Sequence, residues 1–300
     1  MGKFKAQIIE HIDETKEYIE KLKIIHVKRK YKDVIQAVND EFDRYNKQIK
    51  PEMEKLNGHE HIAKKEIEDR IIRLIDDNEE ILTIPFHYGL DNLGIIAAKN
   101  GLENVVLRVL DNHEASTFQN MDGYNLGMIA AKHKLEKATL KALDNPIASL
   151  QQDRYGQNIG MIAAMNKLES VVLKALDNEE ACKQLNDFRR NIGFMTAEYG
   201  LGNAVLKTLD KYPEIVNMEG FAGATVEWEL KCNNMLNGLI LEKFNEAKEK
   251  CPPPPRDEEI DWGDEEDDEM ENDEELEDDK YQEAKSGDMF AGVWESETYF

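Results

Sequence analysis

Apolar residues recur at helical spacing through the middle of the chain, in blocks separated by short polar segments. In one block Ile159, Ile162 and Ala163 fall on one helical face. A second stripe follows at i, i+3, i+4, i+7 and i+8 spacing: Leu168, Val171, Val172, Ala175 and Leu176. The polar pair Asn166-Lys167 separates the two stripes. This pattern predicts two amphipathic helices joined by a tight turn.

The helix-pair pattern occurs four times with a fixed period of 33 residues, starting at Asn92, Asn125, Asn158 and Asn191. The copies read NLGIIAAKNGLENVVLRVLDN, NLGMIAAKHKLEKATLKALDN, NIGMIAAMNKLESVVLKALDN and NIGFMTAEYGLGNAVLKTLDK. A fixed period in this range indicates stacked repeats rather than one globular core. One helix pair cannot bury both of its faces, so we expect an all-α array in which neighbouring copies cover one another.

Each copy places a glycine two residues after its asparagine, at Gly94, Gly127, Gly160 and Gly193. The asparagine is a good helix N-cap, so the glycine falls inside the first turn of the helix. Glycine there costs about 0.5–1 kcal/mol relative to alanine. Because the cost recurs in every copy, we expect neighbouring repeats to approach each other closely at these glycines.

The repeat resembles the ankyrin repeat. The period matches, Gly123 and Gly156 occupy the glycine position of the ankyrin β-turn, and Asp153 occupies its acidic position. Other matches are the alanine pairs and the inter-helix glycines: Ala97-Ala98, Ala130-Ala131, Ala163-Ala164, Gly101 and Gly200. The departure is Asn-Leu-Gly-Ile, or a close variant, where ankyrins have Thr-Pro-Leu-His.

The resemblance covers residues 57–250 and implies a helix-pair solenoid with β-turn fingers. Four full repeats would span residues 84–215, between two degenerate caps. In the upstream cap we expect a helix pair, with a polar first helix at 59–65 and a second at 67–78. In the downstream cap Ala224 stands at the asparagine register, and helices are expected at 225–231 and 235–244.

Residues 1–56 form a predicted N-terminal helical extension of two helices. The first stripe consists of Phe4, Ile8, Ile9, Ile12, Ile19 and Leu22. The second consists of Tyr31, Val34, Ile35, Val38, Phe42, Tyr45 and Ile49, and we expect it to pack on the first repeat. The basic cluster Lys28-Arg29-Lys30-Tyr31-Lys32 between them suits either a solvated helix corner or a contact with phosphate, lipid headgroups or the acidic tail.

The net charge of −24 is concentrated at the C-terminal end. Residues 256–300 contain 21 acidic and 3 basic residues, which gives −18. Four prolines, Pro252–Pro255, precede this segment, so residues 251–300 are predicted to be a proline-rich spacer and a disordered acidic tail. Met289, Phe290, Trp294, Tyr299 and Phe300 close the tail. The tail could solubilise the protein, dock through these residues, or bind basic proteins.

The sequence does not contain a P-loop, a Gly-x-Gly-x-x-Gly fingerprint, a Gly-x-Ser-x-Gly elbow or a kinase signature. His59 and His61 are two residues apart, on different faces of a helix, and no third ligand is spaced nearby. The acidic tail does not have the pattern of an EF-hand loop. We therefore expect no catalytic activity, no metal site and no cofactor.

Three cysteines, Cys182, Cys232 and Cys251, have no paired spacing, which favours a reducing compartment. No apolar run reaches the length of a membrane span, and residues 1–16 do not have the apolar core of a signal peptide. The expected location is the cytoplasm, and secretion into a host cell is compatible with the same sequence.

The ankyrin resemblance implies a partner-binding face made of the fingers and the exposed side of the first helices. On it the candidate residues are Tyr88, Asp91, Met121, Tyr124, Lys132, His133, Arg154, Tyr155, Gln157, Phe188, Arg189, Arg190 and Tyr199. Tyr, Phe, Met and Arg are enriched at interfaces. Alternatively, the aromatic residues connect neighbouring turns.

Two functions are compatible with these features. The first is an adaptor that binds a protein partner on this face, with the acidic tail modulating binding. The second is a charge-driven binder whose tail sequesters basic proteins or mimics nucleic acid. The negative net charge disfavours direct nucleic-acid binding, and the sequence leaves the oligomeric state open.

Overall fold

The computed structural model describes residues 24–53, 60–86 and 91–253. The chain separates into two units, Met1–Pro254 and Pro255–Phe300, and all described residues lie in the first. This part of the chain is mostly α-helical, and apart from two isolated β-bridges it contains no strand. The all-α prediction is therefore confirmed. The acidic tail, its terminal aromatic residues and the stripe from Phe4 to Leu22 lie outside the described residues.

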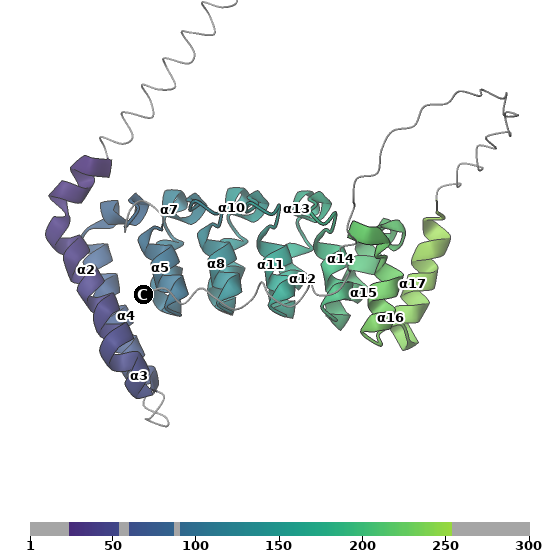
Figure 1. Ribbon diagram of the computed structural model, residues 1–300, viewed down its shortest axis with the longest axis horizontal. Coiled ribbons are helices and arrows are strands. Elements are labelled where there is room, and N and C mark those ends of the chain that lie inside the picture. The colour runs from purple at the N-terminus through teal and green to yellow at the C-terminus, as the bar shows by residue number, and fades with distance from the viewer. Residues whose placement is uncertain (1–23, 54–59, 87–90, 254–300) are drawn as a thin grey trace, which may run out of the picture. The chain divides into compact units, whose positions relative to one another are not determined.

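The helices pack in three rows, two of which correspond to the predicted helix pairs (Figure 1). The first row consists of α5 (Leu93–Lys99), α8 (Leu126–Lys132), α11 (Ile159–Met165), α14 (Ile192–Glu198) and α16 (Val226–Cys232). The second row consists of α4 (Glu60–Asp76), α6 (Glu103–Val109), α9 (Glu136–Ala142), α12 (Glu169–Ala175), α15 (Gly202–Lys211) and α17 (Gly238–Lys250). Within each row, every helix contacts the next one along the chain.

A third row of short helices was not predicted from the sequence: α7 (His113–Thr117), α10 (Pro146–Leu150) and α13 (Glu179–Lys183). Each follows a second-row helix, and α10 contacts both α7 and α13. Asn112, Asn145 and Asn178 are their N-caps, and each side chain accepts a hydrogen bond from a backbone N–H of its own helix.

The asparagine that opens each repeat is buried and hydrogen-bonded on both sides of its amide. The Oδ1 atoms of Asn92, Asn125 and Asn158 each accept a hydrogen bond from the amide three residues later, at 2.9–3.0 Å. Their Nδ2 groups donate to the carbonyl oxygens of Ala115, Ala148 and Ala181, respectively, at 2.8–3.0 Å. All three asparagines are 0% exposed. We call Asn92, Asn125 and Asn158 the asparagine ladder, because each one joins the first and third helices of its repeat.

Glutamine side chains extend the asparagine ladder from one repeat to the previous one. Gln151 accepts a hydrogen bond from Asn125 Nδ2 at 2.8 Å and donates to the Thr117 carbonyl at 2.7 Å. Gln184 makes the equivalent bonds with Asn158 at 2.8 Å and with the Leu150 carbonyl at 2.7 Å. Half-buried glutamine amides thus link neighbouring repeats along the third row.

Charged side chains link the second-row helices. Lys141 Nζ donates to the Leu107 carbonyl at 2.8 Å, and it pairs with Asp111 at 2.5 Å. The same two contacts recur one repeat later at Lys174 and another repeat later at Lys207. Each lysine therefore satisfies a carbonyl near the C-terminus of the preceding helix, where a positive charge is favourable.

The glycines in the first-row helices lie where the neighbouring repeat approaches. A Cβ atom on Gly127 would lie 2.5 Å from Ile159 Cδ1 and 2.7 Å from Ala142 Cβ. A Cβ atom on Gly160 would lie 2.5 Å from Ile192 Cδ1. The predicted close approach of the next repeat is confirmed at Gly94, Gly127 and Gly160, and it explains why these repeats have glycine here despite its cost in a helix. At Gly193 the added Cβ would instead meet Thr208 and Ile215 of the same repeat, at 2.6 and 2.8 Å.

Two details at the ends of the array differ from prediction. The upstream cap is a single continuous helix, α4, rather than a helix pair, because residues 60–76 contain no glycine or proline that would end it. The downstream cap begins one residue later than the period predicts. Thr225, not Ala224, caps α16, and its hydroxyl accepts a hydrogen bond from the Trp228 amide at 3.2 Å.

The N-terminal segment packs against α4 instead of forming a separate unit. It contains α2 (Lys32–Arg44), the π-helical turn η1 (Tyr45–Ile49) and α3 (Lys50–Met53). Val38, Phe42 and Tyr45 are buried in the same core as Leu93 of the first repeat. In the basic cluster, Lys30 pairs with Glu80 at 3.2 Å. Short 3-10 helices complete the fold: η2 (Glu79–Thr83), η4 (Pro213–Asn217) and η5 (Phe221–Gly223).

Replacing Gly127 by alanine should lower the free energy of unfolding by about 1–3 kcal/mol, because the added methyl would collide with Ile159 and Ala142. Denaturant titration followed by circular dichroism measures this change. Gly202→Ala is the matched control, since Gly202 is also helical but its added methyl would meet only Met235, at 3.8 Å. That change should raise stability by about 0.5–1 kcal/mol. Equal effects of the two substitutions would contradict the close-approach explanation.

Candidate partner-binding surface

The segments preceding the first-row helices form closed turns. Asn120, Asp153 and Asn186 each accept two backbone hydrogen bonds at Oδ1 from residues two and four positions later, at 2.8–3.1 Å. Their own backbone N–H groups donate to the carbonyl four residues later, at 2.9–3.0 Å. Short polar side chains that accept local amides favour this geometry, so the tip residues of each turn are held in place.

Successive turns are hydrogen-bonded to each other. The Arg154 amide donates to the Asp122 carbonyl at 3.1 Å, and the Asp187 amide donates to the Tyr155 carbonyl at 3.0 Å. The Phe221 amide likewise donates to the Phe188 carbonyl at 2.9 Å. The turns therefore form a continuous row beside the first-row helices, and the candidate residues at their tips are supported by backbone contacts.

Within each repeat, the residue before the helix cap contacts the residue eight positions later, in the last turn of the helix. Asp91 Oδ2 lies 2.6 Å from Lys99 Nζ, and Lys132 Nζ lies 5.1 Å from the centre of the Tyr124 ring. We call these positions the paired strip, which comprises Asp91, Lys99, Tyr124, Lys132, Gln157, Met165, Arg190 and Glu198.

The two later repeats use different chemistry at the same positions of the paired strip. Gln157 Nε2 lies 3.4 Å from Met165 Sδ, and Arg190 Nη1 lies 2.5 Å from Glu198 Oε1. The four pairs are thus acid–base, aromatic–base, amide–thioether and base–acid. Since the buried ladder residues repeat nearly unchanged, the paired strip is where the repeats differ in surface chemistry.

The turn tips carry the exposed apolar members of the predicted set. Met121 is 81% exposed, Phe188 is 47% exposed and Tyr155 is 40% exposed. Arg154 pairs with Asp122 at 2.7 Å and lies 4.8 Å from the centre of the Tyr155 ring. Large apolar groups at successive tips, with charged groups between them, are typical of a protein-binding surface.

Phe188 also connects two turns, as the alternative interpretation of the aromatic residues expects. Its ring packs edge-on against Phe221 of the next turn, with 6.3 Å between the ring centres. Phe221 is 64% exposed, so the aromatic pair remains accessible to a partner. Tyr124 is more enclosed, and burial, followed by the negative charge of Asp153, raises the pKa of its hydroxyl.

The remaining predicted residues are distributed around this surface. Lys132 and His133 are exposed at the end of α8, and Tyr199 is half-buried after α14. Partial desolvation, followed by the positive charge of Lys132, lowers the pKa of His133. Arg189 is exposed at a turn tip, and Tyr88 lies outside the described residues.

Sequence analysis missed Phe221, an exposed residue of this surface, and Glu229, a buried residue of α16 near Arg190. Both belong to the degenerate downstream repeat, where the one-residue shift to Thr225 hides the register. Counted from Thr225, Glu229 corresponds to Ile96, Ile129, Ile162 and Met195. A hydrophobic core position occupied by a carboxylate is the signal that could have identified it.

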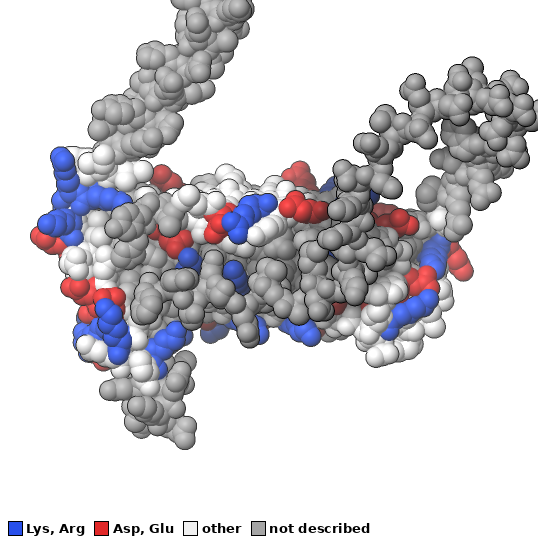
Figure 2. Space-filling view, viewed as in Figure 1, with Lys and Arg blue, Asp and Glu red and all other residues white. Residues whose placement is uncertain are grey.

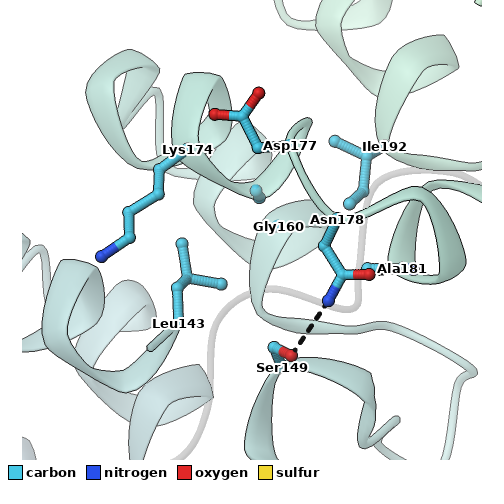
Figure 3. A pocket seen from close by; sticks show the side chains of 9 residues that line it. Leu143, Ser149, Gly160, Lys174, Asp177, Asn178, Ala181 and Ile192 are labelled. Carbon is cyan, nitrogen blue, oxygen red and sulfur yellow. Dashed lines mark hydrogen bonds between the residues drawn. The ribbon is translucent and has the colours of Figure 1, made fainter. Parts of the chain in front are cut away.

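The described residues contain no group of three or more His, Cys, Asp or Glu side chains placed to hold a metal ion. His59 lies outside them. A cavity of about 290 Å³ opens between neighbouring repeats, and Leu143, Gly160 and Ile192 contribute to its walls (Figure 3). The polar side chains around it are already paired, for example Asn178 with Ser149 at 3.2 Å and Lys174 with Asp144 at 2.5 Å. The cavity is therefore a packing gap between repeats. Its polar side chains already have partners, so they do not form a ligand-binding site.

Comparisons with known proteins add no family assignment. No family model matches the sequence, and a search of curated proteins finds no match. None of the described helices is long and apolar enough to cross a membrane.

Arg189→Gly should raise the free energy of unfolding by about 0.5–1 kcal/mol. Arg189 has φ = 58°, in the left-handed region, where the equivalent residues of earlier turns are Gly123 and Gly156. Denaturant titration measures the difference. The control is Asp187→Gly, because Asp187 is exposed in the same turn but has negative φ. This change should lower the free energy of unfolding by about 0.5–1 kcal/mol, because glycine makes the unfolded chain more flexible. A lower free energy of unfolding for both variants would contradict this prediction, and would show that the side-chain contacts of Arg189 stabilise the fold by more than its backbone strain destabilises it.

Proposed function

We propose that this chain is a non-catalytic adaptor of the ankyrin type, a solenoid whose turns act as β-turn fingers. Its protein partner binds the surface formed by the turn tips and the paired strip, and the acidic tail modulates that binding. The observation that carries the proposal is the contrast between positions. The asparagine ladder and the second-row lysines repeat from copy to copy, whereas the paired strip changes its chemistry in every repeat.

The exposed apolar residues support the same surface. Met121, Tyr155, Phe188 and Phe221 occupy four successive turns, and each is at least 40% exposed. A partner that covers them would remove apolar area from water at rigid, backbone-supported positions, which favours binding without a large ordering cost. On the face seen in Figure 2, the described residues that are visible carry interspersed positive and negative side chains, a distribution that suits a protein partner better than a polyanion.

The charge-driven alternative is supported by the −18 charge of residues 256–300. The two functions differ in their dependence on salt. Binding that depends on the tail should weaken steeply as ionic strength rises, because exposed charges are screened. Binding that depends on apolar turn tips should persist.

The test is affinity capture from native lysate with residues 1–300, at low and high salt. We expect Met121→Ala combined with Tyr155→Ala to reduce retention of the principal captured protein by about 30-fold or more, since a single central hot-spot side chain contributes about 2 kcal/mol or more. Leu239→Ala is the matched control, because Leu239 is an apolar residue of α17, 54% exposed and far along the chain from both turns.

Removal of residues 256–300 should change retention only modestly at high salt. Complete loss of the captured protein with the tail, together with full retention by the double variant, would overturn the adaptor proposal. That outcome would assign binding to the tail.

A further inference from the structure

Two carboxylates, Glu198 and Glu229, lie near the guanidinium of Arg190 where α14 meets α16, and only Glu198 is paired with it. Arg190 Nη1 lies 2.5 Å from Glu198 Oε1, and Glu229 of α16 lies within electrostatic range of both groups. The described part of the chain contains four buried side-chain atoms without a hydrogen-bond partner, and two of them are Arg190 Nε and Glu198 Oε2. The cluster therefore has more negative than positive charge and unused hydrogen-bonding capacity.

Glu229 is the exceptional member of the cluster. It is only 6% exposed, and no hydrogen bond or ion pair from another described side chain reaches its carboxylate. Burial, followed by the charge of Glu198, raises the pKa of Glu229. In the four preceding repeats the equivalent position holds isoleucine or methionine. A buried carboxylate without a partner destabilises the fold, so an apolar residue here would be more stable.

The carboxylate of Glu229 remains within reach of solvent. Its oxygens are not among the fully buried, unpartnered atoms, unlike Oε2 of Glu198. Beside the cluster, Arg190 lies 5.9 Å from the centre of the Phe188 ring, and Phe188 contacts the exposed Phe221. An acidic cluster with an adjoining exposed aromatic pair is thus present at one end of the paired strip.

We propose that Glu229 and Glu198 bind a cationic side chain, lysine or arginine, from an extended segment of the protein partner, while an apolar neighbour in that segment packs on Phe188 and Phe221. An incoming cation would neutralise the excess charge and donate a hydrogen bond to the carboxylate of Glu229, which has no side-chain partner among the described residues. A divalent metal ion fits poorly for two reasons. Glu198 is already paired with the positive Arg190, and the cluster contains only two carboxylates. This inference rests on the proposed function and specifies which chemistry its surface recognises.

The test uses the full chain and four pools of immobilised pentapeptides, randomised except for a central arginine, lysine, norleucine or glutamate. Binding is measured at physiological salt. We expect the arginine and lysine pools to retain the wild-type chain about 10-fold more than the norleucine pool, and Glu229→Gln to abolish that preference. Glu242→Gln is the control, since it removes the same charge from an exposed position of α17 and should leave the preference intact.

A second measurement separates binding from structural support. If Glu229 serves a ligand, Glu229→Gln should raise the midpoint of thermal unfolding of the free chain, because it removes an unpartnered charge. A structural residue would instead lower it when substituted. Equal retention of all four pools, or a preference that survives Glu229→Gln, would overturn the inference. The proposed function would still stand if the lysate partner depended on Met121 and Tyr155.

Discussion

The buried amide of the asparagine ladder is the interaction on which the rest of the structure depends. One side chain caps a first-row helix through its oxygen and holds a third-row helix through its nitrogen. Threonine or serine could cap the helix but would not provide the amide donors that reach Ala181 and Gln184. Because these groups are fully buried, each unmade bond would leave a polar atom without water. The ladder thus fixes the spacing and orientation of successive repeats.

Because the ladder holds the stack together, the residues on the opposite side of each first-row helix can vary. Buried amides and glycine contacts hold the stack, and lysines satisfy the second-row carbonyls. The paired strip contributes little to this framework, since its ion pairs are exposed or half-buried and such pairs stabilise weakly. Sequence differences there change surface chemistry at small cost to stability. In the interaction that we propose, Glu229 follows the same principle, because its buried charge lowers the stability of the fold and is available to a cationic partner.

The helix pairs were predictable because the sequence contains four copies of one pattern. Each copy shows the same apolar spacing at the same period. The close approach at Gly127 followed from its recurrence in a costly position. The five-residue third-row helices were missed because such segments are too short to show periodicity, and Asn145 alone resembles a turn residue. The surface positions were identified, but not their pairing. Contacts such as Arg190 with Glu198 join a turn to a helix end and depend on packing that no local pattern encodes.

The most direct test of the ladder compares Asn158→Ala with Asn112→Ala by equilibrium denaturation. Both residues cap helices, but Asn158 also donates to the Ala181 carbonyl and to Gln184. We predict a loss of about 1 kcal/mol for Asn112→Ala, the usual effect of a lost cap, and about 3 kcal/mol or more for Asn158→Ala, which also leaves the buried Ala181 carbonyl unpaired and removes the bond to Gln184. Equal losses would show that the ladder asparagine is only a helix cap, and would contradict its role in joining the first and third helices of its repeat.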